Sequence, residues 1–339
     1  MTEFFAEYGL FLLKAITVVG ALVFVIAAAA AASRKAGSQE GLEVESLNKK
    51  YRSRAKALQK VVLGKSRWKA VVKADKARDK AAKSRTDRPR TFVIDFKGDL
   101  KASAVQSLRE EVSAVLAVAG EGDEVVVRLE NYGGVVHEHG LGASQLARIR
   151  DRNIPLTVTV DKVAASGGYL MACVANRIVA APFAILGSIG VIAQLPNFNR
   201  MLESHGVDFE QITAGEYKRN VTMFGKNTDA DRAKLKEQLE DVHSLFKDAV
   251  ATYRANLDLA KVATGEHWYG SRALELGLAD ELKTSDALLA ELAADRDLYS
   301  VSYKVRKPLQ KRLMANVDDV LEKVDAAGWR RRFESRLPR

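Results

Sequence analysis

The sequence predicts an α/β fold, because short apolar segments of strand length alternate with amphipathic helical segments from Thr91 onward. The chain has 339 residues, of which 47% are hydrophobic and only six are proline, so it is long enough to bury a large core. A long uncharged segment and a strongly basic segment precede the alternating region. We therefore expect four parts: a membrane anchor (1–33), a basic helical spacer (34–90), an α/β domain (91–300) and a basic helical extension (301–339).

The segment from Gly9 to Ala32 is long and apolar enough for one transmembrane helix. Lys14 is its only charged residue, and the 18 residues 15–32 carry no charge. About 20 apolar residues span a bilayer as a helix. A cleaved signal peptide, with its cleavage site in the run Ala28–Ala32, is the alternative. Acidic residues before the run, together with its length, favour an anchor that is not cleaved.

Positive charge is concentrated directly after this anchor. Residues 33–90 contain 19 Lys plus Arg and six Asp plus Glu, a net charge of +13, whereas the whole chain has +10. Because basic loops stay on the cytoplasmic side, this charge predicts a single-pass protein of the cell (inner) membrane whose α/β domain is cytoplasmic. The single Cys173 fits a reducing compartment without requiring one.

The basic segment itself predicts one long solvated helix over residues 44–90 that breaks at Asp87-Arg88-Pro89. Three roles remain open for it: a charged spacer, a contact with anionic lipid headgroups, or an arm that binds nucleic acid. Few aromatic residues besides Trp68 are interleaved, and no nucleic-acid-binding module follows. We expect the lipid bilayer as a partner and no nucleic acid.

The remaining elements follow from hydrophobic periodicity. The predicted strands are 92–96, 124–129, 156–160, 178–180 and 185–192, and the predicted helices are 105–116, 141–152, 229–256 and, in the extension, 309–324. Strands that alternate with helices predict crossover connections and a layered core.

Two glycine pairs lie where predicted strands end. Gly133-Gly134 follows the strand that ends near Glu130, and Gly167-Gly168 follows Ser166. Glycine allows backbone N–H groups to point into a cleft without obstruction by a side chain. Such pairs are typical of tight turns, and also of the two N–H donors that stabilise an oxyanion in acyl transfer, in this chain those of Gly134 and Gly167.

Ser166 and Lys218 are the candidate nucleophile and base, since no His–Asp arrangement lies near the serine in the sequence. A lysine with its ordinary pKa of about 10.4 is protonated at neutral pH and accepts no proton. Burial disfavours the ammonium form, so Lys218 must be desolvated in the active state. Glu216 and Arg219 flank it with opposite effects on its pKa.

Three ordered blocks resemble the catalytic blocks of the signal peptide peptidase A family of membrane serine peptidases. They are Val163–Tyr169, Gly187–Val191 and Thr213–Lys218. The anchor, the basic spacer and a closing block at Thr264–Asp280 resemble the SohB-type branch of this family. Three blocks in order are a much stronger signal than any one of them.

The resemblance implies roles for single residues. Ser166 would be the nucleophile, Lys218 the general base and Ser188 a support for the lysine amine, while Gly134 and Gly167 would form the oxyanion hole. It implies a membrane-anchored serine endopeptidase without cofactor or metal. Extended peptides such as signal peptide remnants or membrane-protein fragments would be its substrates.

The resemblance also implies an architecture. The fold would be a Clp/crotonase-like spiral of ββα units, assembled into a homo-oligomeric ring in which a neighbouring protomer can supply the lysine. Well-known relatives place the catalytic domain outside the cytoplasm. The resemblance therefore implies a periplasmic catalytic domain, whereas the charge rule predicts a cytoplasmic one. One departure is local: family members usually carry Ser-Pro before the first glycine pair, where this chain has Asn131-Tyr132, so the preset φ of proline is lost.

Alternatives to the Ser–Lys pair stay open. His137 and His139 alternate as in a strand, but no third ligand lies at motif spacing, so no metal site is expected. A His-based triad with Ser166 depends on geometry that sequence does not fix. At the level of function, the alternatives are a crotonase-like acyl-CoA enzyme, which needs no hydroxyl at Ser166, and a catalytically inactive membrane scaffold.

Overall fold

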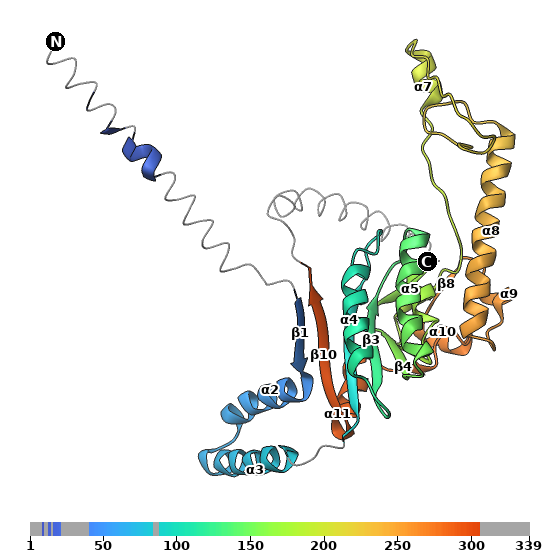
Figure 1. The fold of residues 1–339 in the computed structure, drawn as a ribbon. Coiled ribbons are helices and arrows are strands. Elements are labelled where there is room, and N and C mark those ends of the chain that lie inside the picture. The colour runs from blue at the N-terminus through green and yellow to red at the C-terminus, as the bar shows by residue number, and fades with distance from the viewer. Residues whose placement is uncertain (1–8, 10–12, 15, 22–40, 84–87, 306–339) are drawn as a thin grey trace. The chain divides into compact units, whose positions relative to one another are not determined.

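The computed structural model describes residues 9, 13–14, 16–21, 41–83 and 88–305. The chain divides into two compact units: Leu42–Tyr303, and the chain ends Met1–Gly41 with Lys304–Arg339. Figure 1 shows the helices and strands of the unit Leu42–Tyr303, which holds every candidate site residue.

Most of the predicted transmembrane segment, Gly9–Ala32, lies outside the described residues, and so does the predicted C-terminal extension beyond residue 305. Residues 16–21, within the predicted segment, are helical. Among the residues that the structure describes, no helix combines the length and the apolar character needed to cross a bilayer.

Strands and helices alternate through the unit, as the periodicity predicts. The strands are β1 (Gly41–Ser46), β2 (Arg90–Lys97), β3 (Glu124–Glu130), β4 (Leu156–Val160), β5 (Val163–Ala165), β6 (Arg177–Ala180), β7 (Ile185–Gly187), β8 (His267–Tyr269), β9 (Glu281–Leu282) and β10 (Asp297–Lys304). The helices are α2 (Leu47–Val62), α3 (Lys65–Lys83), α4 (Val105–Val118), α5 (Val136–Asp151), α6 (Gly167–Ala172), α7 (Asn199–Ser204), α8 (Asp229–Tyr253), α9 (Leu259–Val262), α10 (Gly270–Glu275) and α11 (Ser285–Asp295). The predicted α/β class is confirmed.

The strands form two sheets. The larger has the order β1-β10-β2-β3-β4-β6-β9, and every pair from β10 to β9 is parallel. The smaller has the order β5-β7-β8, with β5 parallel to β7. The consecutive strands β4 and β5 therefore lie in different sheets, and so do β6 and β7.

The larger sheet is covered on both faces, which explains why its central strands carry buried residues on both sides. On one face, Ile94, Val127 and Val158 belong to the main core, which also contains buried residues of α4, α5 and α6. On the other face, Val93 and Val126 belong to a second cluster. This second cluster also contains Leu288 and Leu289 of α11 and Leu47 of α2.

The predicted helical spacer (34–90) differs from the structure in two ways. Its residues 41–46 form the strand β1 rather than helix. The helix that follows is divided in two, because Leu63 has an extended backbone (φ −91°, ψ 137°) and ends α2 before Gly64. Ser46 caps α2 by accepting a hydrogen bond from the Lys49 N–H. Leu47, the first residue of α2, is buried in the cluster that also contains Val93 and Val126 of the sheet.

A buried carboxyl links α4 to β10. Glu111 is 5% exposed, and its Oε1 accepts a hydrogen bond from the Tyr303 backbone N–H at 2.7 Å. Burial raises the pKa of Glu111 from its ordinary value of 4.5 to about 7, although the hydrogen bond opposes this shift. Because the folded-state pKa is raised, the stabilisation from the protonated form is complete below pH 4.5 and is lost as the pH rises towards 7.

Replacing Glu111 by glutamine is expected to remove this pH dependence, because the amide oxygen still accepts from Tyr303 but does not ionise. The variant should be more stable than the wild type at pH 8 by about 2 kcal/mol and nearly equal at pH 5. Thermal unfolding at pH 5, 6 and 8 measures the difference. Glu110→Gln, at an exposed neighbour on α4, is the matched control and should show no such trend. Parallel pH profiles for Glu111→Gln and the wild type would contradict the assignment.

Candidate active site

Ser166 lies in a sharp turn between β5 and α6. Its backbone has φ 53° and ψ −121°, a conformation that is uncommon for a residue with a Cβ and that is often found at functional sites. Two hydrogen bonds hold it: Ser166 N–H donates to the Gly187 carbonyl at 2.8 Å, and Leu170 N–H donates to the Ser166 carbonyl at 3.0 Å. The turn leaves Ser166 half-buried at the start of the helix.

The first glycine pair lies against this turn. Asn131 anchors it, because its N–H donates to the Val163 carbonyl at 2.9 Å and its carbonyl accepts from Ala165 N–H at 3.0 Å. Gly133 then passes so close to the turn that an added Cβ would lie 2.7 Å from Ser166 Cβ. The structure thus brings the Gly133-Gly134 loop and Ser166 together, as predicted from their places after strands.

The N–H groups of Gly134 and Gly167 are both available to a ligand. Within the described part of the chain, neither N–H donates a hydrogen bond to another residue. Gly167 is the first residue of α6, where an N–H group has no partner inside the helix. An oxyanion hole requires two such donors without other partners near the reacting serine.

Gly133→Ala is expected to disrupt this arrangement. Gly133 has φ 86°, and an added Cβ would also lie 2.8 Å from the Ala165 carbonyl oxygen and 2.9 Å from Gly167 N. The loop must therefore move away from Ser166, which should lower kcat for protein hydrolysis about 100-fold or more. Hydrolysis of fluorescein-labelled casein measures the loss.

Gly140→Ala is the matched control for this substitution. Gly140 lies in α5, and a Cβ there meets no atom within 4 Å. Its activity should equal that of the wild type, while circular dichroism shows whether both variants are folded. A Gly133→Ala enzyme that retains wild-type kcat would contradict the role of the loop.

Ser188 lies beside Ser166 at the ends of two paired strands. Ala165 of β5 and Gly187 of β7 are register partners, and the serine that follows each has a positive φ (53° for Ser166 and 52° for Ser188). Ser188 N–H donates to the Glu266 carbonyl at 2.6 Å. The predicted strand 185–192 stops at Gly187 because this conformation breaks the extended backbone.

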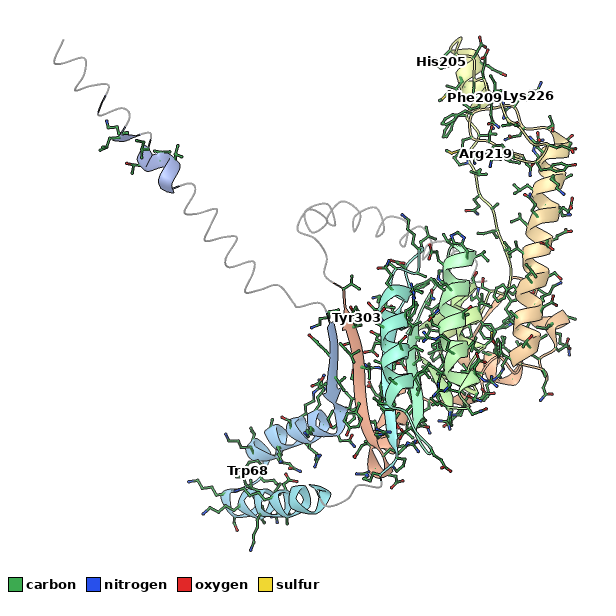
Figure 2. All side chains as sticks on the ribbon, in the orientation of Figure 1. Trp68, His205, Phe209, Arg219, Lys226 and Tyr303 are labelled. Atoms are coloured by element: carbon green, nitrogen blue, oxygen red, sulfur yellow. The ribbon has the colours of Figure 1, made fainter. Side chains whose placement is uncertain are left out.

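Lys218 lies in the segment between α7 and α8 and forms no bond with Ser166. It is exposed, and its amine forms no hydrogen bond or ion pair with the residues that the structure describes. Figure 2 shows Arg219, the next residue, on the projecting segment that also carries α7. The structure of a single chain therefore brings together Ser166, Ser188, Gly134 and Gly167, but not Lys218.

The expectation that His137 and His139 lie on a strand is wrong. Both belong to the first turn of α5, which begins at Val136. Two residues that are two positions apart lie on the same side of a strand, but they do not lie on the same side of a helix. His137 is exposed and His139 is fully buried against the glycine loop. Among the described residues, no group of three or more His, Cys, Asp or Glu side chains is arranged to hold a metal ion.

Comparisons with known proteins identify the family. Residues 3–146 match the model described as peptidase family S49 N-terminal, and residues 148–299 match the model of peptidase family S49. The chain belongs to peptidase family S49, and it is a peptidase.

The relatives in this family agree with the SohB-type resemblance found in the sequence. A probable protease SohB of Haemophilus influenzae is 43% identical over 92% of each chain. A probable protease SohB of Buchnera aphidicola is 51% identical over 69% of each chain. Among solved structures, a lysine-to-alanine mutant of the 1510-N membrane-bound stomatin-specific protease in complex with a substrate peptide matches with a TM-score of 0.43 and 12% identity, covering 68% of this chain and 99% of that one.

Proposed function

We propose that this protein is a membrane-anchored serine endopeptidase in which Ser166 attacks the peptide bond and Lys218 takes its proton. The observation that carries the proposal is the strained turn at Ser166 with two unbonded N–H donors, Gly134 and Gly167, beside it in the described part of the chain. Attack on a carbonyl creates an oxyanion that both donors stabilise, while the lysine returns the proton to the leaving amine. Ser188 supports the lysine amine once that amine reaches the serine.

The exposed position of Lys218 supports activation by assembly. An amine in water stays protonated, so the lysine must be buried in the active state. The segment that carries Lys218 is also unusually apolar on its surface: Ile212 is 96% exposed and Ile192 is 64% exposed. Apolar surfaces of this kind are typical of protein interfaces. We propose a homo-oligomeric ring in which the segment packs on a neighbouring protomer and delivers Lys218 to its Ser166.

The two sheets support the finer fold proposal, a Clp/crotonase-like spiral of ββα units. β4 of the larger sheet is followed by β5 of the smaller sheet and then by α6, and β6 and β7 repeat the same change of sheet. Each repeat brings a strand end of the smaller sheet to the site, Ser166 after β5 and Ser188 after β7. The acyl-CoA alternative has no comparable support, since the chain belongs to a peptidase family.

Extended peptides are the proposed substrates, with remnants of signal peptides or of membrane proteins as the class. Membership of a peptidase family supports peptide substrates in general. The geometry supports an extended conformation, because a peptide can bind as an additional strand beside the Gly133-Gly134 segment, pairing main chain with main chain. Such pairing would bring a scissile carbonyl to the N–H donors of Gly134 and Gly167.

Association with the membrane is part of the proposal. The basic residues of α2, and those of α3 up to Lys76, are largely exposed, and so are Leu58, Val61 and Val62 near the end of α2. Basic and apolar side chains on one helix favour an anionic lipid surface. The charge of residues 33–90 supports a catalytic unit on the cytoplasmic side.

Labelling with a fluorophosphonate probe tests the proposed chemistry, because the probe reacts with activated serines and not with the site of an acyl-CoA enzyme. Mass spectrometry of the labelled full-length protein should locate the adduct on Ser166. An unlabelled protein that is folded and assembled would contradict the proposal.

A further inference from the structure

The side chains of Asn131 and His139 form a buried hydrogen-bonded pair behind the glycine loop. Asn131 Oδ1 accepts a hydrogen bond from Gly133 N–H at 2.9 Å and lies 3.1 Å from His139 Nε2. Both residues are 0% exposed. Burying polar side chains costs free energy unless they form hydrogen bonds. The bonds of this pair therefore favour one fixed orientation of the two side chains.

The bond from Gly133 fixes the orientation of the Asn131 amide. A backbone N–H needs an oxygen acceptor, so the amide of Asn131 presents Oδ1 to Gly133 and its nitrogen to Met171 Sδ at 3.4 Å. Both ring nitrogens of His139 face an oxygen acceptor, since Nε2 lies 3.1 Å from Asn131 Oδ1 and Nδ1 lies 3.0 Å from the Val135 carbonyl oxygen. A neutral ring carries one N–H, so it donates to Asn131 in the tautomer with the proton on Nε2. Burial lowers the pKa of His139, and the hydrogen bond with the Val135 carbonyl opposes this shift.

The same imidazole ring also contacts the turn that carries the serine. A Cβ added to Gly167 would lie 2.5 Å from His139 Cγ, so the ring lies directly against this glycine. Asn131 is enclosed as well, since a Cβ on Gly98 would lie 2.4 Å from Asn131 Cγ. One ring therefore touches both sides of the site: the loop through Asn131 and the turn at Gly167.

We propose that His139 and Asn131 are positioning residues of the oxyanion hole, which hold the N–H groups of Gly134 and Gly167 at a fixed separation. The inference rests on the proposed function of Ser166 and of these two donors. The side chain of Tyr132 does not fix the backbone angle φ, as a proline ring at this position would, so the loop needs another restraint. The bond from Gly133 N–H to Asn131 Oδ1 is this restraint, and His139 holds the Asn131 side chain in the orientation that makes it.

Two substitutions distinguish the effect of the His139 N–H donor on activity from the effect of the shape of its ring. His139→Phe keeps a flat ring against Gly167 but removes the donor, whereas His139→Gln places an amide donor near the position of Nε2. With fluorescein-labelled casein and the full-length protein, His139→Phe should lower kcat about 10- to 100-fold with KM unchanged. His139→Gln should restore kcat to within a few-fold of the wild type. His137→Phe, at an exposed position on the same helix, is the matched control and should have no effect.

A double substitution tests whether the two residues act together. Asn131→Leu should lower kcat to a similar extent, and His139→Phe combined with Asn131→Leu should cost little more than either change alone. Independent losses that multiply would overturn the pairing. If His139→Phe does not fold, His139→Gln and Asn131→Leu carry the test, and wild-type kcat in Asn131→Leu would overturn the proposal.

Ser166→Ala, assayed in parallel, separates this inference from the proposed function. Hydrolysis that persists in Ser166→Ala contradicts the function itself, whatever His139 does. An inactive Ser166→Ala together with wild-type kcat in His139→Phe contradicts only the positioning role. Equal losses in His139→Phe and His139→Gln would also overturn it, because the hydrogen bond would then not be what matters.

Discussion

Ser166→Ala is expected to abolish hydrolysis of fluorescein-labelled casein by the assembled protein, with a loss of about 10⁴-fold or more in kcat. The reason is that no other hydroxyl occupies the turn between β5 and α6. The N–H of Gly167 at this turn and the N–H of Gly134 in the loop after β3 have no other partner in the described part of the chain. The fold should be unaffected, because the bonds that hold Ser166 in place come from its backbone.

Ser144→Ala is the matched control for this loss. Ser144 is exposed on α5, where its hydroxyl donates to the Gly140 carbonyl at 2.9 Å, so its removal should leave kcat unchanged. Circular dichroism and gel filtration of each variant report on folding and assembly. Casein hydrolysis by Ser166→Ala at the wild-type rate would exclude Ser166 as the nucleophile.

Lys218→Ala is expected to lower kcat about 10²- to 10⁴-fold, the range for loss of a general base. Because Lys218 is exposed and unbonded to Ser166 in the single chain, we further expect it to act on a neighbouring protomer. Mixing Ser166→Ala and Lys218→Ala subunits should then restore activity, since some sites combine an intact serine with an intact lysine from the next subunit. Equal mixing of a symmetric ring would restore about a quarter of the wild-type activity.

Lys226→Ala provides the control on the same segment, since Lys226 is also exposed there (Figure 2). It should keep wild-type activity alone and in mixtures. Mixed subunits that stay inactive, although gel filtration shows that they have exchanged, would mean that Ser166 and Lys218 of one chain must act together.

Much of the central sheet could be predicted from the sequence, because its strands are apolar on both faces. The predicted strand 156–160 coincides with β4, and 124–129 differs from β3 by one residue. The predicted face of α4 was also correct: Val105, Leu108 and Val112 are buried. Burial on both faces leaves a continuous apolar pattern in the sequence, which periodicity detects.

Other elements depend on contacts between residues that are distant in the sequence, which hydrophobic periodicity does not reveal. Residues 41–46 form a strand because they pair beside β10, which lies about 250 residues later in the sequence. The start of α5 was missed for two reasons. No capping side chain precedes Val136, and the order His137-Glu138-His139 resembles the period-two alternation of a strand.

The candidate site was predictable in part. Ser166 and the two glycine pairs were singled out because they follow predicted strands, whereas Ser188 lay inside the predicted strand 185–192 and was named only through the family resemblance. In the structure Ser166 and Ser188 follow the paired strands β5 and β7. The side-chain role of Asn131 was missed, since the sequence shows only that proline is absent from position 132. A polar residue directly before a Tyr-Gly-Gly turn, with a histidine eight residues later, is the signal that could have indicated it.

A structure of the assembled full-length protein tests the central claim, activation of Ser166 by Lys218, most directly. The predicted result is a Lys218 Nζ atom within about 2.6 to 3.2 Å of Ser166 Oγ, with the lysine contributed by the adjacent protomer and shielded from water. Lysine side chains that remain in solvent, out of hydrogen-bonding distance of Ser166 in every pairing of subunits, would contradict it.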